Sequence, residues 1–234
     1  MKIIILCGGK GTRLSEETKL IPKPMVKIGH KPILVHIIKI YMKYGFKDFI
    51  LALGYKGKII KEYFKSNPIK NANIDCVDTK QSTLTGGRIL LLKKKIKKNE
   101  DFMVTYGDGV ANINIKALIN FHKKYKKIVT LTAVRPPVRF GAISIDKNNY
   151  VKNFKEKPQI NNNWINGGFF VMNYSVFKFI KDTHEMFEHR PIEKLSKLKQ
   201  VKAYKHHDFW QCMDTLREKE YLNNLWFKGK AKWK

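Results

Sequence analysis

A glycine-rich loop near the amino terminus is the first part of the sequence that could do chemistry. In "MKIIILCGGKGTRL", an apolar run leads into Gly8, Gly9 and Gly11, and the loop ends in Thr12 and Arg13. Glycine allows a ligand to approach the backbone, and an arginine guanidinium offers a fork that matches phosphate oxygens. The spacing is neither the GxGxxG of dinucleotide-binding proteins nor the P-loop that ends in GKS or GKT. The loop therefore indicates phosphate binding of another kind, or a tight turn with a solvated arginine.

Three further charged residues stand beside the ends of expected strands and helices. Lys23 lies between two prolines in "PKPM", and a plain turn gives no reason for this arrangement. Asp108 lies between two glycines after "DFMVTY", and Asp214 lies in "CMDT". The place of Asp108 directly after a buried strand favours a ligand role for its carboxylate. Each aspartate also has a plainer interpretation, because Asp108 could be a turn residue and Asp214 could cap the helix expected in "LREKEYLNNLW".

Apolar strands alternate with amphipathic helices along the first part of the chain. The expected strands are "IIILC", "DFILALGY", "DFMVTY" and "IVTLTAV", and the expected helices are "KPILVHIIKIYMKYG", "GKIIKEYFK" and "NIKALINFHKKYKK". This alternation predicts an α/β fold with a largely parallel sheet, in which ligands bind beyond the carboxyl ends of the strands. The glycine-flanked breaks after Leu6 and Tyr106 belong on that edge of the sheet.

The sequence changes character after about residue 135. "FGAISIDKNNYVKNFKEKP" contains two short strand-like pieces around Lys147-Asn148-Asn149, which is a hairpin pattern, and "WINGGFFVMN" predicts another strand. We expect a small β-rich part there that acts as a lid or shelf. No internal repeat, low-complexity linker or Pro/Ser-rich boundary separates the two parts. We therefore expect a single domain over 1–234, with one half in about 1–135 and the other in about 136–234.

The net charge of +28 raises the possibility of a nucleic-acid partner. Only six of the 47 basic residues are arginine, and 41 are lysine, whereas proteins that read base edges or clamp phosphates depend on arginine. Lysine in this excess is typical of solvated faces. We expect no specific nucleic-acid partner.

Cysteine usage and hydropathy limit the class of protein further. Cys7, Cys76 and Cys212 are odd in number and scattered, so we expect reduced core residues rather than a disulfide framework or a structural zinc site. No apolar run is long enough to cross a bilayer and no signal-type cleavage site is present. We expect a cytoplasmic protein with no membrane partner.

Motifs along nearly the whole chain resemble those of one enzyme family. They are "LCGGKGTRLSEETKLIPKPMVKIGHKPIL", "TLTGGRI", "TYGDGVA", "FGAI", "FKEKP", "INGGFFV", "FWQCMDTLRE" and "LWFKGKAKWK". The chain resembles the sugar-1-phosphate nucleotidyltransferases, and among them the cytidylyltransferases that act on glucose-1-phosphate. The resemblance implies a Rossmann-like mixed sheet flanked by helices. It also implies a Mg²⁺-dependent reaction of a nucleoside triphosphate with a sugar-1-phosphate that releases pyrophosphate.

The resemblance also assigns roles to individual residues. Arg13 and Lys23 are implied as the catalytic groups on the triphosphate, and Asp108 and Asp214 as ligands of Mg²⁺. The residues implied to bind the nucleotide are Leu6, Cys7, Gly8, Gly9, Gly11, Thr12, Arg13, Lys23, Thr83, Arg88 and Gly107. The residues implied to bind the sugar phosphate are Glu156, Lys157, Asn166 and Gly167.

The substrates implied are CTP and glucose-1-phosphate, with CDP-glucose as the product and surface-glycan or lipopolysaccharide synthesis as its use. The same chemistry with UTP, dTTP or another sugar phosphate is the nearest alternative. A non-catalytic binder of nucleotide sugars or nucleic acid is the alternative of another class. The family also implies a homo-oligomer, although the segment before Ile74 is shorter than in typical members.

The chemistry agrees with these residue types. The second pKa of a phosphate monoester is about 6, so a sugar phosphate is already a dianionic nucleophile at neutral pH and needs no general base. The site must position two anions and stabilise the charge that develops. Arginine, lysine and a metal ion do both. We expect the "LCGG" loop, Thr83 and "TGGR" to face the base. In "TGGR", Gly86 and Gly87 would let the backbone meet the ring.

Overall fold

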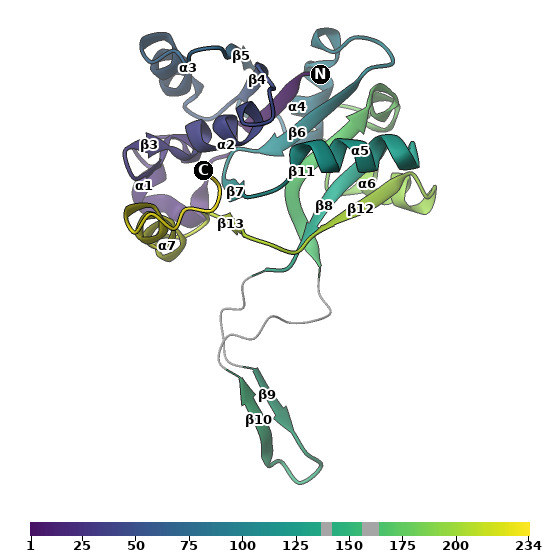
Figure 1. Cartoon of the computed structure of the whole chain (residues 1–234). Helices are drawn as coiled ribbons and strands as arrows, with labels where there is room; N and C mark the ends of the chain where they lie inside the picture. Colours follow the sequence, from purple (N-terminus) through teal and green to yellow (C-terminus); the bar gives the residue numbers. More distant parts are fainter. Residues whose placement is uncertain (137–141, 156–163) are drawn as a thin grey trace.

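A seven-stranded sheet forms the centre of the molecule, and the computed structural model describes residues 1–136, 142–155 and 164–234 (Figure 1). The strands of this sheet, in spatial order, are β12 (Val201–His206), β8 (Val129–Val134), β11 (Ile165–Asn173), β6 (Asp101–Tyr106), β1 (Ile3–Cys7), β4 (Asp48–Leu53) and β5 (Asn73–Asp78). β11 runs antiparallel to both of its neighbours, and the other neighbouring pairs are parallel. The predicted mixed, largely parallel sheet is confirmed.

Helices cover both faces of this sheet (Figure 1). The α-helices are α1 (Ser15–Thr18), α2 (Ile33–Met42), α3 (Gly57–Ser66), α4 (Thr85–Leu91), α5 (Ile115–Tyr125), α6 (Arg190–Lys197) and α7 (Leu216–Phe227). The 3₁₀ segments are η1 (Thr12–Leu14), η2 (Lys23–Met25), η3 (Lys93–Lys95) and the longer η4 (Tyr174–Phe179). Within the described residues there are also three small antiparallel pairs: β2 (Lys27–Ile28) with β3 (Lys31–Pro32), β7 (Gly109–Ala111) with β13 (Trp210–Cys212), and β9 (Ala142–Ile145) with β10 (Val151–Lys155).

β1 is covered on both faces, which explains why its sequence shows no alternation of polar and apolar residues. Ile3, Ile5 and Cys7 face a core that includes the apolar sides of α2, α5 and α7, and Ile4 faces a second core with α4, η4 and α6. Successive side chains of a strand point to opposite faces, so a strand covered on both faces must be apolar throughout. The expectation of a strand buried on both faces is confirmed.

The two parts of the sequence share the central sheet. β11, from the second part, pairs with β6 and β8 of the first part, and β12 pairs with β8. The predicted hairpin around Lys147 is present as β9 and β10, which project away from the sheet in Figure 1. The sequence did not predict β5, α6 or β12.

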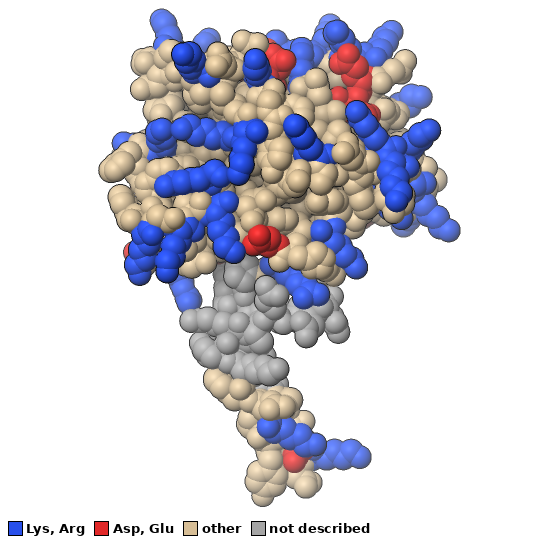
Figure 2. All heavy atoms as spheres, in the orientation of Figure 1, with Lys and Arg blue, Asp and Glu red and all other residues tan. Residues whose placement is uncertain are grey.

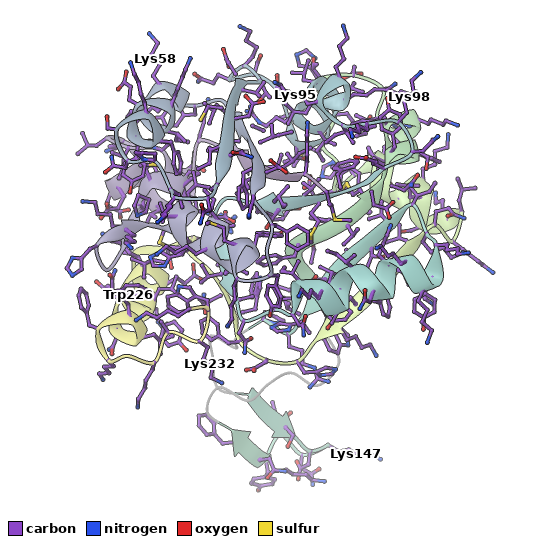
Figure 3. All side chains as sticks on the ribbon, turned by 45° about the horizontal axis from the view of Figure 1, so that its top comes forward. Lys58, Lys95, Lys98, Lys147, Trp226 and Lys232 are labelled. Atoms are coloured by element: carbon purple, nitrogen blue, oxygen red, sulfur yellow. The ribbon has the colours of Figure 1, made fainter. Side chains whose placement is uncertain are left out.

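Lysine and arginine side chains are spread over the visible surface of the body and over the hairpin (Figure 2). In Figure 3 the labelled Lys58, Lys98 and Lys147 lie on three separate parts of the fold. This dispersed pattern is the one expected for solvated faces. Among the helices that the structure describes, none is both long and apolar enough to cross a membrane.

The three cysteines are free. Cys7 is buried in the core, as predicted, whereas Cys76 and Cys212 are partly exposed. The expectation of three core cysteines is therefore wrong for two of them: β5 is an edge strand, and the short strand β13 pairs with β7 beside a cavity.

Candidate active site

The glycine loop follows the carboxyl end of β1 and turns sharply into η1. Gly11 lies in the left-handed region with φ of 67°, where a side chain would be strained and its Cβ would meet Cγ2 of Thr18 at 2.9 Å and Cβ of Lys23 at 3.0 Å. Gly107, after β6, donates its N–H to the carbonyl of Leu6 at 3.1 Å. The two strand ends are thereby tied together.

Arg88 of α4 supports the glycine loop by hydrogen bonding to its backbone. The buried guanidinium donates through Nη2 to the carbonyl of Gly8 at 3.1 Å and through Nη1 to the carbonyl of Leu53 and Oγ1 of Thr79, at 2.9 and 2.5 Å. Burial lowers the pKa of Arg88, although an arginine remains charged at any physiological pH. A Cβ on Gly8 would meet this guanidinium at 2.1 Å. Arg88 therefore sets the shape of the loop, and its contact with a base stays a prediction.

The two glycines of "TGGR" allow α4 to pack against the chain before α6. A Cβ on Gly87 would lie 2.1 Å from the carbonyl oxygen of Thr183, and one on Gly86 would lie 2.7 Å from that of Glu185. Gly87 also donates its N–H to Glu185 at 3.1 Å. We expected these glycines to bring the backbone to a base, but their α-carbons face the segment 183–187 instead.

A cavity of about 440 Å³ lies above the loop, and we call it the glycine-loop cavity. It is lined by all the residues that the resemblance assigns to the nucleotide, together with Lys10, Pro24, Gln81, Leu84, Thr85, Tyr106, Asp108 and Met186. The structure thus brings these residues together from separate parts of the chain. Their contact with a nucleotide stays a prediction.

Four charged side chains form a compact cluster at the mouth of the loop. Nζ of Lys23 lies 2.7 Å from Oδ2 of Asp108 and also contacts Oδ1 of Asp214. Arg13 contacts the other oxygen of Asp214 at 2.7 Å. Burial lowers the pKa of Lys23, but the two carboxylates outweigh it, and the pKa is raised. Lys23 therefore stays protonated and holds the two carboxylates around one positive charge.

The pairing of β7 with β13 places Asp214 beside Asp108, although 106 positions separate them in the sequence. Met213 donates its N–H to the carbonyl of Asp108 at 2.8 Å. The alternative that Asp214 caps α7 is wrong, because the cap is Thr215, which forms a capping box with Glu218. The side chain of Asp214 is thereby left to face Lys23 and Arg13.

Cys212, Asp214 and Glu218 are a second grouping that could in principle hold a metal, since one ligand atom of each lies within 4.8 Å of the others. Oε2 of Glu218 accepts from the N–H groups of Asp214 and Thr215 at 2.7 and 3.0 Å. Burial is the main cause that raises the pKa of the Cys212 thiol to about 12, and the negative charges of Glu218 and Asp214 raise it further. A neutral thiol and a carboxylate engaged in capping make this a weaker metal site than Asp108 with Asp214.

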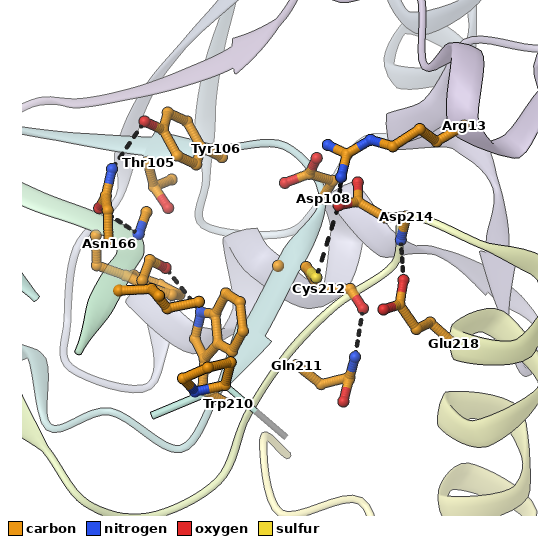
Figure 4. A pocket seen from close by; sticks show the side chains of 16 residues that line it. Arg13, Thr105, Tyr106, Asp108, Asn166, Trp210, Gln211, Cys212, Asp214 and Glu218 are labelled. Atoms are coloured by element: carbon orange, nitrogen blue, oxygen red, sulfur yellow. Dashed lines mark hydrogen bonds and ion pairs between the residues drawn. The ribbon is translucent and has the colours of Figure 1, made fainter. Parts of the chain in front are cut away.

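A second cavity, of about 360 Å³, adjoins the first, and we call it the Asn166 cavity (Figure 4). Arg13, Tyr106 and Asp108 line both cavities. Asn166 and Gly167 line the second cavity, and Trp210 closes one side of it and donates Nε1–H to the carbonyl of Gly167 at 2.7 Å. The acidic and basic cluster thus stands where two neighbouring ligands would meet.

Residues 2–216 match the family model described as nucleotidyl transferase. The chain belongs to the nucleotidyl transferase family. The resemblance inferred from the motifs is thereby confirmed.

Curated relatives agree with this assignment. The chain is 48% identical to glucose-1-phosphate cytidylyltransferase of Salmonella typhimurium, covering 100% of this chain and 99% of the relative. It is 42% identical, with the same coverage, to a probable glucose-1-phosphate cytidylyltransferase of Bacillus subtilis. Among solved structures it is similar to HddC from Yersinia pseudotuberculosis, with a TM-score of 0.76, 26% identity and coverage of 96% and 99% of the two chains.

Two of the predicted sugar-phosphate residues, Glu156 and Lys157, lie outside the described residues. The other two, Asn166 and Gly167, line one cavity with the predicted metal ligands. Sequence reasoning overlooked Tyr106, and it interpreted Trp210 as a core or subunit-contact aromatic rather than as part of the site. Both stand within a few positions of the two aspartates, in "TYGDG" and "FWQCMD", so their place beside those motifs was an available signal.

Proposed function

We propose that this chain transfers a cytidylyl group from CTP to glucose-1-phosphate, giving CDP-glucose and pyrophosphate. One observation carries the proposal: two adjoining cavities share Arg13, Tyr106 and Asp108, and a cluster of two cations and two carboxylates stands at their boundary. A transfer between two phosphates needs two neighbouring anion sites with charge stabilisation between them. The full-length similarity to the cytidylyltransferase relatives supports the choice of substrates.

In the proposed reaction, a phosphate oxygen of glucose-1-phosphate attacks the α-phosphorus of CTP. A phosphorus–oxygen bond forms there, the bond from the α-phosphorus to the bridging oxygen of the β-phosphate breaks, and pyrophosphate leaves with that electron pair. The attacking group is already an anion at neutral pH, so the residues must orient it and offset the charge repulsion. Arg13, between the two cavities, suits both tasks.

We further propose that Asp108 and Asp214 hold one Mg²⁺. The support is that the ammonium group of Lys23 contacts both carboxylates, so their oxygens already face a common cation. When bound there, Mg²⁺ would supply positive charge to the triphosphate and the departing pyrophosphate. Lys23 would then exchange its two carboxylate partners for triphosphate oxygens.

Selection of the base is the finer part of the proposal. Cytosine has an amino donor where uracil has a carbonyl acceptor, and a buried site that pairs with one leaves polar groups unpaired with the other. The loop from Leu6 to Arg13 and Thr83 line the glycine-loop cavity, and we propose that the base lies against them. The connection between Ser66, where α3 ends, and Asn73, where β5 begins, is the segment that the resemblance implies is shorter than in typical family members.

The test is release of pyrophosphate by the purified chain with CTP, glucose-1-phosphate and Mg²⁺. We expect release only when both substrates are present, and loss of release on chelation of the metal. A non-catalytic binding protein would release none with any pair of triphosphate and sugar phosphate. A cytoplasmic location and a homo-oligomeric state are part of the same proposal, and size-exclusion chromatography with light scattering tests the second.

A further inference from the structure

A chain of hydrogen bonds connects the two cavities through a residue that lines neither of them. Tyr106, at the end of β6, lines both cavities. Its hydroxyl donates to Oε1 of Glu188 at 2.5 Å and lies 3.0 Å from Nδ2 of Asn166, which donates to it. Glu188 lies in the segment just before α6, 82 positions after Tyr106.

The other oxygen of Glu188 reaches the glycine-loop cavity. Oε2 accepts from the hydroxyl of Thr85, the first residue of α4 and part of the lining of that cavity. The Thr85 oxygen in turn accepts the N–H of Phe187 at 3.0 Å. One carboxylate therefore joins the helix that carries Arg88 to the tyrosine that faces the second cavity.

The directions of these hydrogen bonds fix the Asn166 amide. Oδ1 of Asn166 accepts the N–H of Gly168 at 2.9 Å, so its Nδ2 must point toward Tyr106. Tyr106 can accept from Nδ2 because its own proton goes to Glu188. Each amide atom keeps one further hydrogen-bonding position for a ligand in the cavity.

We propose that Glu188 is a positioning residue for the sugar phosphate: its carboxylate makes Tyr106 an acceptor, which orients Asn166 toward a ligand in the Asn166 cavity. The inference rests on the proposed function of the two cavities. A carboxylate only accepts, so both hydroxyls must donate to it. A glutamine in its place has one accepting and one donating end and no longer fixes the direction of both bonds.

Kinetics of Glu188→Gln test this inference. Losing the orientation of one hydrogen-bonding group at a ligand typically weakens binding by about tenfold. We expect the KM for glucose-1-phosphate to rise by about that factor, with changes of less than about threefold in kcat and in the KM for CTP. Glu193→Gln is the matched control, because Glu193 is exposed on α6 and its substitution removes the same charge. The control is expected to match the wild type.

The second variant is Tyr106→Phe, which removes the hydroxyl between Glu188 and Asn166. It should raise the same KM, and adding Glu188→Gln to it should raise that KM no further, since both substitutions break one chain. Tyr106→Phe alone also tests the inference if Glu188→Gln does not fold. Unchanged KM for glucose-1-phosphate in the folded variants, or additive effects, would overturn it. If the wild type releases no pyrophosphate with any substrate pair, the proposed function itself fails.

Discussion

Packing of α4 against the segment 183–187 predicts a large effect of a very small substitution, Gly87→Ala. The added Cβ would lie 2.1 Å from the carbonyl oxygen of Thr183 and 2.5 Å from its carbonyl carbon and Cα. All three are backbone atoms, so no side chain can rotate away. Ordinary contact begins at about 3.4 Å, and the helix and the segment must separate by more than 1 Å to restore it.

The cost of this separation can be worked out from its parts. Overpacking costs roughly 1–3 kcal/mol, and loosening the two backbone hydrogen bonds that join the elements costs about 1 kcal/mol each. Those bonds run from Leu84 to Thr183 at 3.0 Å and from Gly87 to Glu185 at 3.1 Å. Alanine regains about 1 kcal/mol of helix propensity. The net destabilisation is therefore about 3 kcal/mol, which lowers the Tm of a chain of this size by roughly 6–12 °C.

Urea denaturation followed by circular dichroism measures the change, with Gly9→Ala as the matched control. A Cβ on Gly9 meets nothing within 4 Å, and Gly9 is not among the glycines with positive φ. We expect the control to lie within about 0.5 kcal/mol of the wild type. A Gly87→Ala protein that is as stable as this control would refute the packing argument. Because α4 carries Arg88, we also expect weaker CTP binding by Gly87→Ala.

Three further predictions concern the charged cluster and its support. Asp108→Asn removes one charged ligand of the proposed Mg²⁺ site, and we expect kcat to fall by roughly a hundredfold or more with an unchanged circular dichroism spectrum; near wild-type turnover at low Mg²⁺ would exclude Asp108 from the site. Lys23→Met removes the cation that both carboxylates contact, so the Lys23 ammonium group no longer competes with a metal ion for them. Mn²⁺ should therefore bind the substrate-free variant more tightly than the wild type in an electron paramagnetic resonance titration, and equal or weaker binding would contradict this competition. Thr215→Ala breaks the capping box of α7 and should cost about 1 kcal/mol in urea denaturation; an unchanged midpoint would mean that the box contributes nothing.

The parts of the fold that were predicted are those with a strong local pattern. β1 is apolar throughout and β4 is apolar after Asp48, and α2, between Pro32 and Gly45, has apolar residues at helical spacing and buries most of its residues. β5 and β12 were overlooked because they form the two edges of the sheet and alternate exposed and half-buried positions with charged residues among them. Edge strands carry a weaker apolar signal than central ones, since only part of their surface is covered.

In the candidate site, too, residues with a local sequence signal could be predicted, whereas contacts that only the tertiary fold creates could not. The glycine loop and Asp108 could be predicted because each follows a recognisable strand. The role of Gly87 could not, because its neighbour Thr183 is brought close only by the tertiary fold. Glu188 lacks any local signal, since both hydroxyls that donate to it lie more than 80 positions away. For Asp214, the alternative cap interpretation was wrong by one residue, because Thr215 takes that position; its role as a metal ligand stays a prediction.

A competition among nucleotides tests the central claim most directly. CTP, UTP and dTTP at equal concentrations are incubated with limiting glucose-1-phosphate, Mg²⁺ and the purified chain, and the nucleotide sugars are separated by chromatography and identified by mass spectrometry. The ratio of products equals the ratio of the kcat/KM values for the three triphosphates. Cytidylyl transfer predicts CDP-glucose in excess by a factor of about ten or more. Equal or greater amounts of UDP-glucose or dTDP-glucose would contradict it.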